Sequence, residues 1–345
     1  MKILLCGGGT LGPVVPLLAV LRKMRVLRPD ATFVWAGTPD GPERALVEKE
    51  YVPFCAIPVA KIPRYLTLRL AQWPFAYARA RWAAEKLIAR EQPDLVVSVG
   101  GFTSVPVIRA ASKKGIPCAI HQLDFLPGLS NRAVARMCKS VTSSFRYEKP
   151  AFGWFVKCEQ IPTPCRFGNI EVANAGKGRP VVLILGGGTG ARAINESIDR
   201  CVDTLLPLAN VIHSTGAGKI ESRQNRPGYT VMESLNESSM LESYSAADVV
   251  VSRGGMGTLS ELAALRKAAI VIPMPETHQE KNASALLEGI VIVRQDAKAA
   301  KNMEQAILSL LKDPARRAAL GEKLHELLPT DDGSALAEKW LNLVK

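Results

Sequence analysis

Short runs of aliphatic residues alternate along this chain with segments of helical period. The runs are uninterrupted by polar positions, which is typical of parallel strands that are buried on both faces. We expect strands at residues 2–6, 32–36, 54–58, 95–99, 117–121, 140–143, 181–185, 210–213, 229–232, 248–251 and 269–272. Helices are expected at residues 14–27, 191–208, 301–312, 314–327 and 334–344. This alternation predicts an α/β fold built on parallel sheets.

Two glycine-rich turns stand half a chain apart, at residues 7–12 (GGGTLG) and 186–190 (GGGTG). Each directly follows an aliphatic run and precedes a helical stretch. Such a turn leaves unpaired backbone N–H groups and the positive end of a helix dipole facing a ligand, which suits a phosphate. Either turn alone could be an ordinary tight connection, because short glycine motifs are weak signals. Their repetition favours two nucleotide-binding domains.

The domain organisation is predicted from a break in the pattern. Residues 160–180 are rich in proline and glycine and lack a convincing period, so we expect a linker there. The 345 residues then suit two Rossmann-like domains, at 1–163 and 164–333, whose parallel sheets face an interdomain cleft. The last segment, 334–345, is expected to be a helix that packs back on the N-terminal domain.

A dehydrogenase is the obvious alternative, because Gly7, Gly9 and Gly12 satisfy the dinucleotide fingerprint. That fingerprint also needs an acidic residue at the end of the second strand, to hold the ribose hydroxyls. The strand at 32–36 continues into a Gly-Thr-Pro sequence, and Asp40 lies several residues into the loop. The sequence therefore disfavours a dinucleotide site.

Composition narrows the class of protein further. The hydrophobic fraction is 47%, yet no apolar run approaches the ~18 residues that cross a bilayer. The chain enters a strand at once, so we expect no signal peptide. Seven cysteines without a C-x-x-C pair indicate a reduced, cytoplasmic protein. The four histidines are scattered and no D-x-D pair is present, so we expect no metal site and no cofactor.

The net charge of +12 is concentrated in the N-terminal half. Residues 1–166 hold 24 Lys and Arg against 11 Asp and Glu, a net of +13, which predicts an anionic partner for this half. Within residues 61–90, seven basic residues are interleaved with large apolar ones, which are typical of a membrane interface. The expected membrane residues are Tyr65, Leu66, Trp73, Phe75, Tyr77 and Trp82. The alternative is an amphipathic helix packed on the core; nucleic acid is not expected, since no binding motif accompanies the charge.

Eight short motifs follow one another along the chain, at residues 8–16, 100–106, 121–124, 163–166, 186–192, 213–216, 252–261 and 279–283. In this order they are similar to G-G-T-G-G-H-V-x-P, G-G-Y-x-S-x-P, H-E-Q-N, N-P-V-R, G-G-S-Q-G-A-R, H-x-T-G, C-R-S-G-A-x-T-x-S-E and Q-x-x-N-A. These are motifs of the MurG family of glycosyltransferases, which have the two-domain GT-B fold, and the chain resembles that family over essentially its whole length. The order and spacing of the motifs make the resemblance specific.

The resemblance implies inverting, metal-independent transfer of N-acetylglucosamine from UDP-GlcNAc to muramyl-pentapeptide pyrophosphoryl-undecaprenol in peptidoglycan synthesis. It also implies a peripheral position at the cytoplasmic face of the inner membrane. The residues implied to stabilise the departing UDP are Gly188, Thr189, Gly190, Thr258 and Arg166. Glu261 would accept from the ribose hydroxyls, and Gln279 with Asn282 would contact the sugar. Further substrate contacts are implied at Thr10, Gly12, Phe102, Asp124, Met256 and Gly257.

Three departures from the family motifs affect the expected chemistry. Pro13 stands where the family has a histidine, and a proline can neither take a proton nor bind a phosphate through its side chain. Gln122 and Asp124 replace Glu and Asn of the H-E-Q-N motif. We hypothesise that Asp124, with His121 beside it, supplies the general base. The open alternatives are another GT-B glycosyltransferase, a UDP-sugar epimerase, and a catalytically silent, membrane-associated nucleotide-sugar binder.

Overall fold

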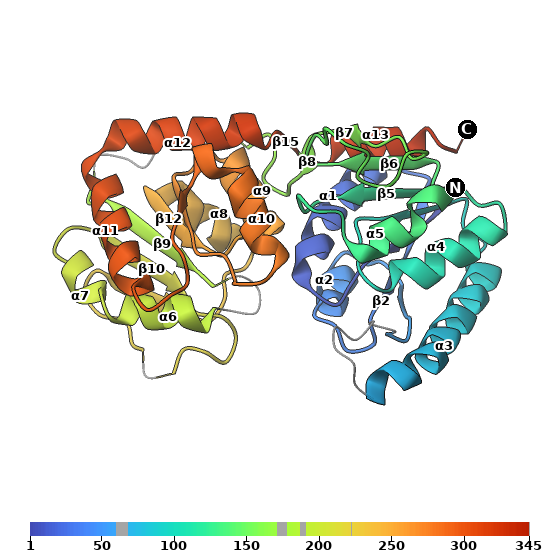
Figure 1. The fold of residues 1–345 in the computed structure, drawn as a ribbon, viewed down its shortest axis with the longest axis horizontal. Helices are drawn as coiled ribbons and strands as arrows, with labels where there is room; N and C mark the ends of the chain where they lie inside the picture. Colours follow the sequence, from blue (N-terminus) through green and yellow to red (C-terminus); the bar gives the residue numbers. More distant parts are fainter. Residues whose placement is uncertain (60–67, 171–177, 187–190, 222, 345) are drawn as a thin grey trace. The chain divides into compact units, whose positions relative to one another are not determined.

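The computed structural model describes residues 1–59, 68–170, 178–186, 191–221 and 223–344, with residues 68–72 described by their backbone alone. The chain forms two compact units (Figure 1). Unit 1 comprises Met1–Arg166 and Asp331–Lys345, and unit 2 comprises Phe167–Thr330. Each unit has its own parallel sheet, so the predicted α/β class is confirmed.

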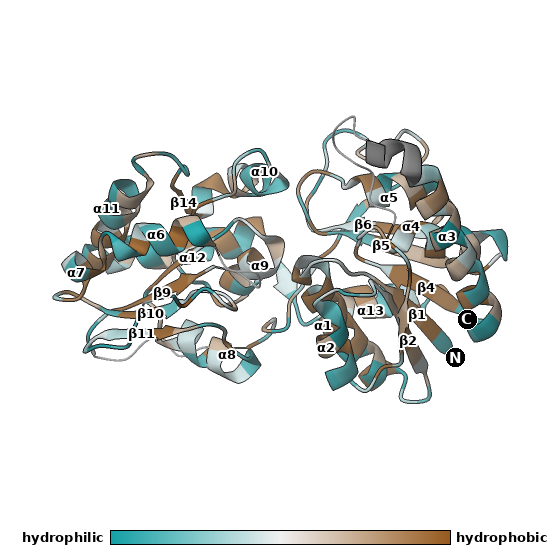
Figure 2. Cartoon of the chain, turned by 90° about the horizontal axis from the view of Figure 1, so that it is seen from below, coloured by the Kyte–Doolittle hydropathy of each residue, from teal (hydrophilic) through white to brown (hydrophobic). Residues whose placement is uncertain are grey.

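The sheet of unit 1 has the strand order β3-β2-β1-β4-β5-β6-β7, and every neighbouring pair is parallel. Its strands are β1 (Lys2–Cys6), β2 (Thr32–Gly37), β3 (Phe54–Ala56), β4 (Leu95–Ser98), β5 (Cys118–Gln122), β6 (Ser140–Ser143) and β7 (Glu159–Gln160). The central strands are buried along their whole length and carry the apolar residues that Figure 2 colours brown. Burial on both faces explains why the sequence shows continuous aliphatic runs.

The helices of unit 1 cover this sheet. They are α1 (Leu11–Leu27), α2 (Glu43–Lys49), α3 (Leu68–Glu91), α4 (Ser104–Lys113), α5 (Leu129–Val134), the short 3₁₀ helix η1 (Ala135–Met137) and α13 (Ser334–Leu341). The red C-terminal helix α13 lies against α1 in Figure 1. Its Trp340 is fully buried, and Gly333 before it has a φ of +91° at a point where a Cβ would crowd the backbone of Val20. The close approach of α13 to α1 therefore requires a glycine at this position.

Unit 2 repeats the arrangement with a parallel sheet in the order β11-β10-β9-β12-β13-β14. Its strands are β9 (Val181–Leu185), β10 (Asn210–Ser214), β11 (Tyr229–Met232), β12 (Val249–Ser252), β13 (Ala269–Val271) and β14 (Val291–Ile292). Its helices are α6 (Arg192–Asp199), α7 (Val202–Leu205), α8 (Glu237–Ala246), α9 (Met256–Ala264), α10 (His278–Ala285), η2 (Leu287–Gly289), α11 (Ala299–Lys312) and α12 (Pro314–Leu327).

Two expectations from the pattern are corrected by the structure. The helix expected at 191–208 is two helices, α6 and α7, because the chain turns at Cys201, whose N–H bonds Ile198 O. The segment expected to be a linker contains β8 (Thr163–Pro164), which pairs with β15 (Thr330–Asp331) in a two-stranded sheet. Strands of two residues are too short to produce a period in the sequence. Residues 171–177 of that segment lie outside the described residues.

Each sheet has one point where the strand order reverses. In unit 1 the reversal lies between β1 and β4, and in unit 2 between β9 and β12. Connections leave these neighbouring strands in opposite directions, so a crevice opens beyond their carboxyl ends, and ligands of open α/β sheets bind there. The turns that follow these four strands are therefore the places to look for a functional site.

Candidate active-site loops

The turn after β1 is held by the neighbouring strand. Trp35 Nε1 donates to Gly7 O at 2.9 Å, and Gly7 N donates to Ala36 O at 3.2 Å. Thr10 then starts α1 with an extended backbone and no hydrogen bond from its side chain to the helix. Thr10 and Gly12, both expected to contact substrate, are exposed at this edge.

The turn after β4 packs directly on the turn after β1. Gly100 and Gly101 both have positive φ, +114° and +100°. A Cβ on Gly101 would lie 3.1 Å from Gly8 O, so this close approach of the two turns favours a glycine at position 101. Phe102 follows with a partly exposed ring. The structure thus brings Phe102 to the same edge as Thr10.

The loop after β5 carries Asp124 and is organised by Gln122. The Gln122 amide donates to the carbonyl oxygens of Asp124 and Leu126 at 2.9 and 3.1 Å. Its Oε1 accepts from Gly128 N at 3.2 Å and from Asn131 Nδ2 at 2.8 Å. A buried amide that uses both its donors and its acceptor fixes the loop. Asp124 is half-buried on this loop, at the carboxyl edge of the sheet.

His121 does not have the surroundings of a general base. It is fully buried in β5, and its ring nitrogens lie 2.9 Å from Thr142 Oγ1 and 3.1 Å from Ser144 Oγ. Burial lowers the pKa of His121 to about 3, because the charged ring would lose its hydration. Both nitrogens are engaged inside the sheet, where His121 links β5 to β6, and these surroundings do not favour the predicted role of His121 beside Asp124.

Two other residues of unit 1 bear on the expected chemistry. Pro13 is the third residue of α1, where the backbone N–H would have no helical partner, so the helix tolerates the proline ring. Arg166 is half-buried beyond β8 at the end of this unit, outside the seven-stranded sheet.

The turn after β12 leads into α9, whose N-terminus meets the conditions for binding an anion. Gly255 caps the helix without a side-chain hydrogen bond, and no acidic residue lies in the first turn. The N–H groups of Met256, Gly257 and Thr258 therefore have no helical partner and sit at the positive end of the dipole. Thr258 adds a half-buried hydroxyl to the same turn.

Glu261 lies one helical turn beyond Thr258 and is 5% exposed. Its Oε2 accepts a hydrogen bond of 2.8 Å from the hydroxyl of Tyr244 on α8. Tyr244 is fully buried, so this bond fixes the orientation of the carboxylate. Residues three apart lie on the same helix face, which places Glu261 beside the free end of α9.

The first turns of α10 hold the glycine turn in place. Asn282 is fully buried, and its Nδ2 donates to Gly254 O at 3.1 Å. A Cβ on Gly254 would lie 2.8 Å from Gln279 O, so the backbones touch. The Gln279 side chain accepts from Met274 N at 3.0 Å. The structure thus brings Gln279 and Asn282 to the end of β12, as positioned neighbours of Met256, Gly257 and Thr258.

The second glycine-rich turn is only partly described. Gly188, Thr189 and Gly190 lie outside the described residues. Behind the turn, Asn195 Nδ2 donates to Thr215 O at 3.1 Å, and its Oδ1 lies 3.0 Å from Nε2 of His213. This buried network joins α6 to β10 and anchors the helix that follows the turn.

Helix α3 separates a core face from an exposed stripe. Its buried residues recur at helical spacing, at Ala80, Ala84, Leu87 and Ile88. On the other side, Phe75 (75% exposed), Arg79, Trp82 (60% exposed) and Lys86 follow one another three or four residues apart. Lys86 Nζ lies 3.5 Å from the centre of the Trp82 ring. We call these four residues the α3 stripe; its aromatic rings do not serve the core.

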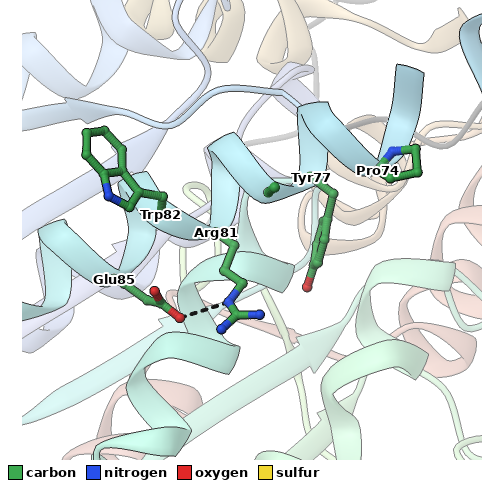
Figure 3. Close-up of a pocket in the computed structure, with 6 residues that line it drawn as sticks. Pro74, Tyr77, Arg81, Trp82 and Glu85 are labelled. Atoms are coloured by element: carbon green, nitrogen blue, oxygen red, sulfur yellow. Dashed lines mark hydrogen bonds and ion pairs between the residues drawn. The ribbon is translucent and has the colours of Figure 1, made fainter. Parts of the chain in front are cut away.

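A shallow hollow adjoins this stripe. Figure 3 shows Pro74, Tyr77, Arg81, Trp82 and Glu85 around it, with Arg81 Nε donating to Glu85 Oε1 at 2.9 Å. The ring of Trp73 stacks on Tyr77 with centres 5.3 Å apart. Of the other expected membrane residues, Tyr65 and Leu66 lie outside the described residues.

Over the described ranges, no helix combines the length and apolarity needed to cross a bilayer. Histidine, cysteine and acidic side chains do not gather there into a group of three suited to a metal ion. All seven cysteines are free thiols.

Sequence patterns do not point to two supporting residues, Tyr244 and Glu43. Tyr244 acts through a contact with Glu261 on another helix, which no local pattern encodes. Gln122 is noted in the sequence as a departure from the family motif, and its role in fixing the loop after β5 follows from the structure. Glu43 is fully buried and bonds the first glycine-rich turn. Its only sequence signal is the pair of glycines, Gly8 and Gly41, that make room for it.

Comparison with known proteins identifies the family. The N-terminal domain model of glycosyltransferase family 28 matches residues 3–143, and the C-terminal domain model matches residues 181–329. The UDP-N-acetylglucosamine--N-acetylmuramyl-(pentapeptide) pyrophosphoryl-undecaprenol N-acetylglucosamine transferase of Clostridium perfringens is 34% identical over 286 residues, which are 79% of this chain and 78% of that protein.

Solved structures agree with the fold. MurG of Acinetobacter baumannii superposes with a TM-score of 0.77 at 22% identity, over 99% of both chains. The glycotransferase of kitacinnamycin superposes with a TM-score of 0.72 at 16% identity, over 100% of this chain and 99% of that one. These likenesses confirm the expected GT-B architecture, and the identity to the clostridial enzyme is high enough to define the family. This chain therefore belongs to the MurG family of N-acetylglucosamine transferases.

Proposed function

We propose that this chain transfers N-acetylglucosamine from UDP-GlcNAc to the muramyl-pentapeptide pyrophosphoryl-undecaprenol lipid of peptidoglycan synthesis. The observation that carries the proposal is the 34% identity, over 79% of the chain, to an enzyme whose name states this reaction. The turns at the carboxyl edge of each sheet support it, because they supply the donors and carboxylates that a nucleotide sugar and a sugar hydroxyl need.

The UDP-sugar binds at the edge of unit 2 in this proposal. The N-terminus of α9 and the Thr258 hydroxyl hydrogen-bond the diphosphate and stabilise the charge that grows on UDP as the sugar leaves. Glu261, oriented by Tyr244, accepts from the ribose hydroxyls. Gln279 lies at the same strand end and contacts the sugar, and the buried Asn282 holds Gly254 beside it. Gly188, Thr189, Gly190 and Arg166 complete the diphosphate contacts.

The acceptor binds at the edge of unit 1, against Thr10, Gly12 and Phe102. Its hydroxyl oxygen forms a bond to the anomeric carbon of the donor sugar from the face opposite UDP, so the configuration inverts. The bond from that carbon to the diphosphate oxygen breaks, and UDP keeps the electron pair. Asp124 takes the hydroxyl proton. The side chain of Pro13, at the start of α1, cannot accept a proton. His121 is buried and cannot reach the acceptor hydroxyl.

The chain works at the cytoplasmic face of the inner membrane, as a peripheral protein. The α3 stripe supports this position, because exposed aromatic rings beside cations bind the interface of an anionic membrane. Lys113 and Lys114, near Trp82, add positive charge at the end of α4.

Transfer itself is the first test. Purified protein, labelled UDP-GlcNAc and the muramyl-pentapeptide lipid in vesicles should yield labelled lipid, followed by extraction and chromatography. A related glycosyltransferase would leave this lipid unlabelled but accept another donor or acceptor. An epimerase would place the label in free sugar, and a silent binder would bind UDP-GlcNAc without turnover. Each of these three results would contradict the proposal.

The role of Asp124 predicts a selective loss of rate. Asp124→Asn removes the proton acceptor and should lower kcat by about 100-fold or more, the usual contribution of a general base. The KM for UDP-GlcNAc should stay unchanged, because the donor binds unit 2. Asp30→Asn, an exposed position, serves as the control. Near-full activity of Asp124→Asn would show that another group takes the proton.

Glu261→Gln predicts a loss of donor affinity. The amide oxygen of the glutamine can still accept from Tyr244. Its NH₂ group replaces the other carboxylate oxygen, and an NH₂ group cannot accept a hydrogen bond from a ribose hydroxyl. Titration calorimetry should find the Kd for UDP about 10- to 100-fold higher, the effect of losing a hydrogen bond to a charged group. Glu242→Gln, exposed on α8, should bind UDP normally. Equal affinities of the two variants would remove Glu261 from the ribose site.

The α3 stripe predicts membrane affinity. The double variant Phe75→Ser and Trp82→Ser should bind vesicles containing an anionic phospholipid at least about tenfold more weakly in a sedimentation assay. Leu287→Ser, which removes an equally exposed apolar side chain from unit 2, should bind like the unaltered protein. Binding by both should weaken as salt rises, because the charges are screened. Unchanged binding by the double variant would place the membrane contact elsewhere.

A further inference from the structure

The carboxylate of Glu43 is enclosed beneath the first glycine-rich turn. Glu43 is the first residue of α2 and is fully buried. Its Oε1 accepts from Thr38 N at 2.7 Å and from Thr38 Oγ1 at 2.6 Å. Its Oε2 accepts from Gly9 N at 3.2 Å. Two backbone N–H groups and a hydroxyl thus converge on one carboxylate, which is the donor set that a phosphate usually meets at such a turn.

The surrounding glycines fit the carboxylate. A Cβ on Gly8 would overlap Oε1 of Glu43, and a Cβ on Gly41 would overlap Oε2. A Cβ on Gly37 would lie 3.2 Å from Oε1. Glycines on three sides therefore shape a space that Glu43 fills. In a nucleotide-binding turn the same absence of side chains lets a phosphate approach the backbone.

Part of the capacity of this turn to bind an anion is already used. The N–H of Gly9 is already used by Glu43, and Pro13 lacks the N–H that another residue would present in the first turn of α1. A phosphate at the Gly9 N–H would also have to displace the Glu43 carboxylate oxygen, which already accepts from that N–H. These features oppose the expectation that this turn binds a phosphate.

We propose that Glu43 is a built-in anion that occupies the phosphate position of the first glycine-rich turn. The turn is thereby held rigid without a ligand, and Glu43 is a positioning residue for the acceptor. Two short connections join Glu43 to the proposed acceptor residues. Gly9, which Glu43 bonds, precedes Thr10. Gly8, in the same turn, lies against Gly101, which precedes Phe102. Glu43 cannot be the general base, because no part of it reaches solvent. The role of Glu43 in positioning the acceptor rests on the proposed function. The inference that Glu43 fills the anion position does not.

Chemical rescue tests the filled position without catalysis. Glu43→Ala removes the atoms of one acetate and leaves the donors of Gly9 and Thr38 facing a hole of that size. Its Tm should fall by about 5 °C and recover by several degrees in sodium acetate, at constant ionic strength against chloride. The control variant Glu48→Ala, at an exposed position of the same helix, should keep the Tm of the unaltered protein and gain nothing from acetate. A Glu43→Ala variant that melts like the unaltered protein would contradict the proposal.

Two further measurements decide the role of Glu43 if Glu43→Ala does not fold. In the unaltered protein, inorganic pyrophosphate should leave the amide resonances of Gly9 and Thr38 unshifted; a shift that saturates would show an open anion site.

The second measurement uses Glu43→Gln. This substitution keeps the shape of the side chain but replaces one acceptor oxygen by an NH₂ group, which then faces the N–H and O–H donors of Gly9 and Thr38. It should raise the KM for the lipid acceptor at least about fivefold and leave the Kd for UDP unchanged. Unchanged KM would remove the positioning role. A failed transfer by the unaltered protein would instead contradict the proposed function and leave the rescue and resonance results valid.

Discussion

The rest of this structure depends on how closely the backbone turns at the carboxyl ends of the parallel strands can approach one another. Each sheet reverses its strand order once, and at that point two turns must pass close to one another. In unit 1 this is possible because Gly101 has no Cβ to meet the backbone of Gly8. In unit 2 Gly254, in the turn after β12, likewise lets the backbone of Gln279 on α10 approach closely. The glycines therefore set the shape of both edges before any ligand contact is considered.

The two edges use their unpaired donors differently. At the start of α9 the capping residue Gly255 supplies no side-chain hydrogen bond and no acidic residue lies in the first turn, so its N–H groups suit an anionic ligand. At the first glycine-rich turn the Glu43 carboxylate already accepts from Gly9 N and Thr38 N. This difference suits the proposed function, in which the diphosphate donor binds unit 2 and the acceptor binds unit 1.

The sequence predicts the architecture well, because buried parallel strands and glycine turns leave local patterns. The boundaries of β1, β9 and α12 agree with the expected ones. The surroundings of single side chains are harder to predict. The sequence predicts a role for His121 beside the base, but His121 is buried in β5, where its ring nitrogens meet Thr142 of β6 and Ser144 just after it. Glu43 bonds Gly9 across 34 residues of chain, and only the folded sheet brings them together.

Hydrogen–deuterium exchange of the backbone amides, with and without UDP, tests the central claim most directly. The account predicts that UDP slows exchange at Met256, Gly257 and Thr258 and leaves Gly8 and Gly9 unchanged. Protection of Gly9 with no change at the start of α9 would contradict it, because the diphosphate would then occupy the turn that we assign to Glu43.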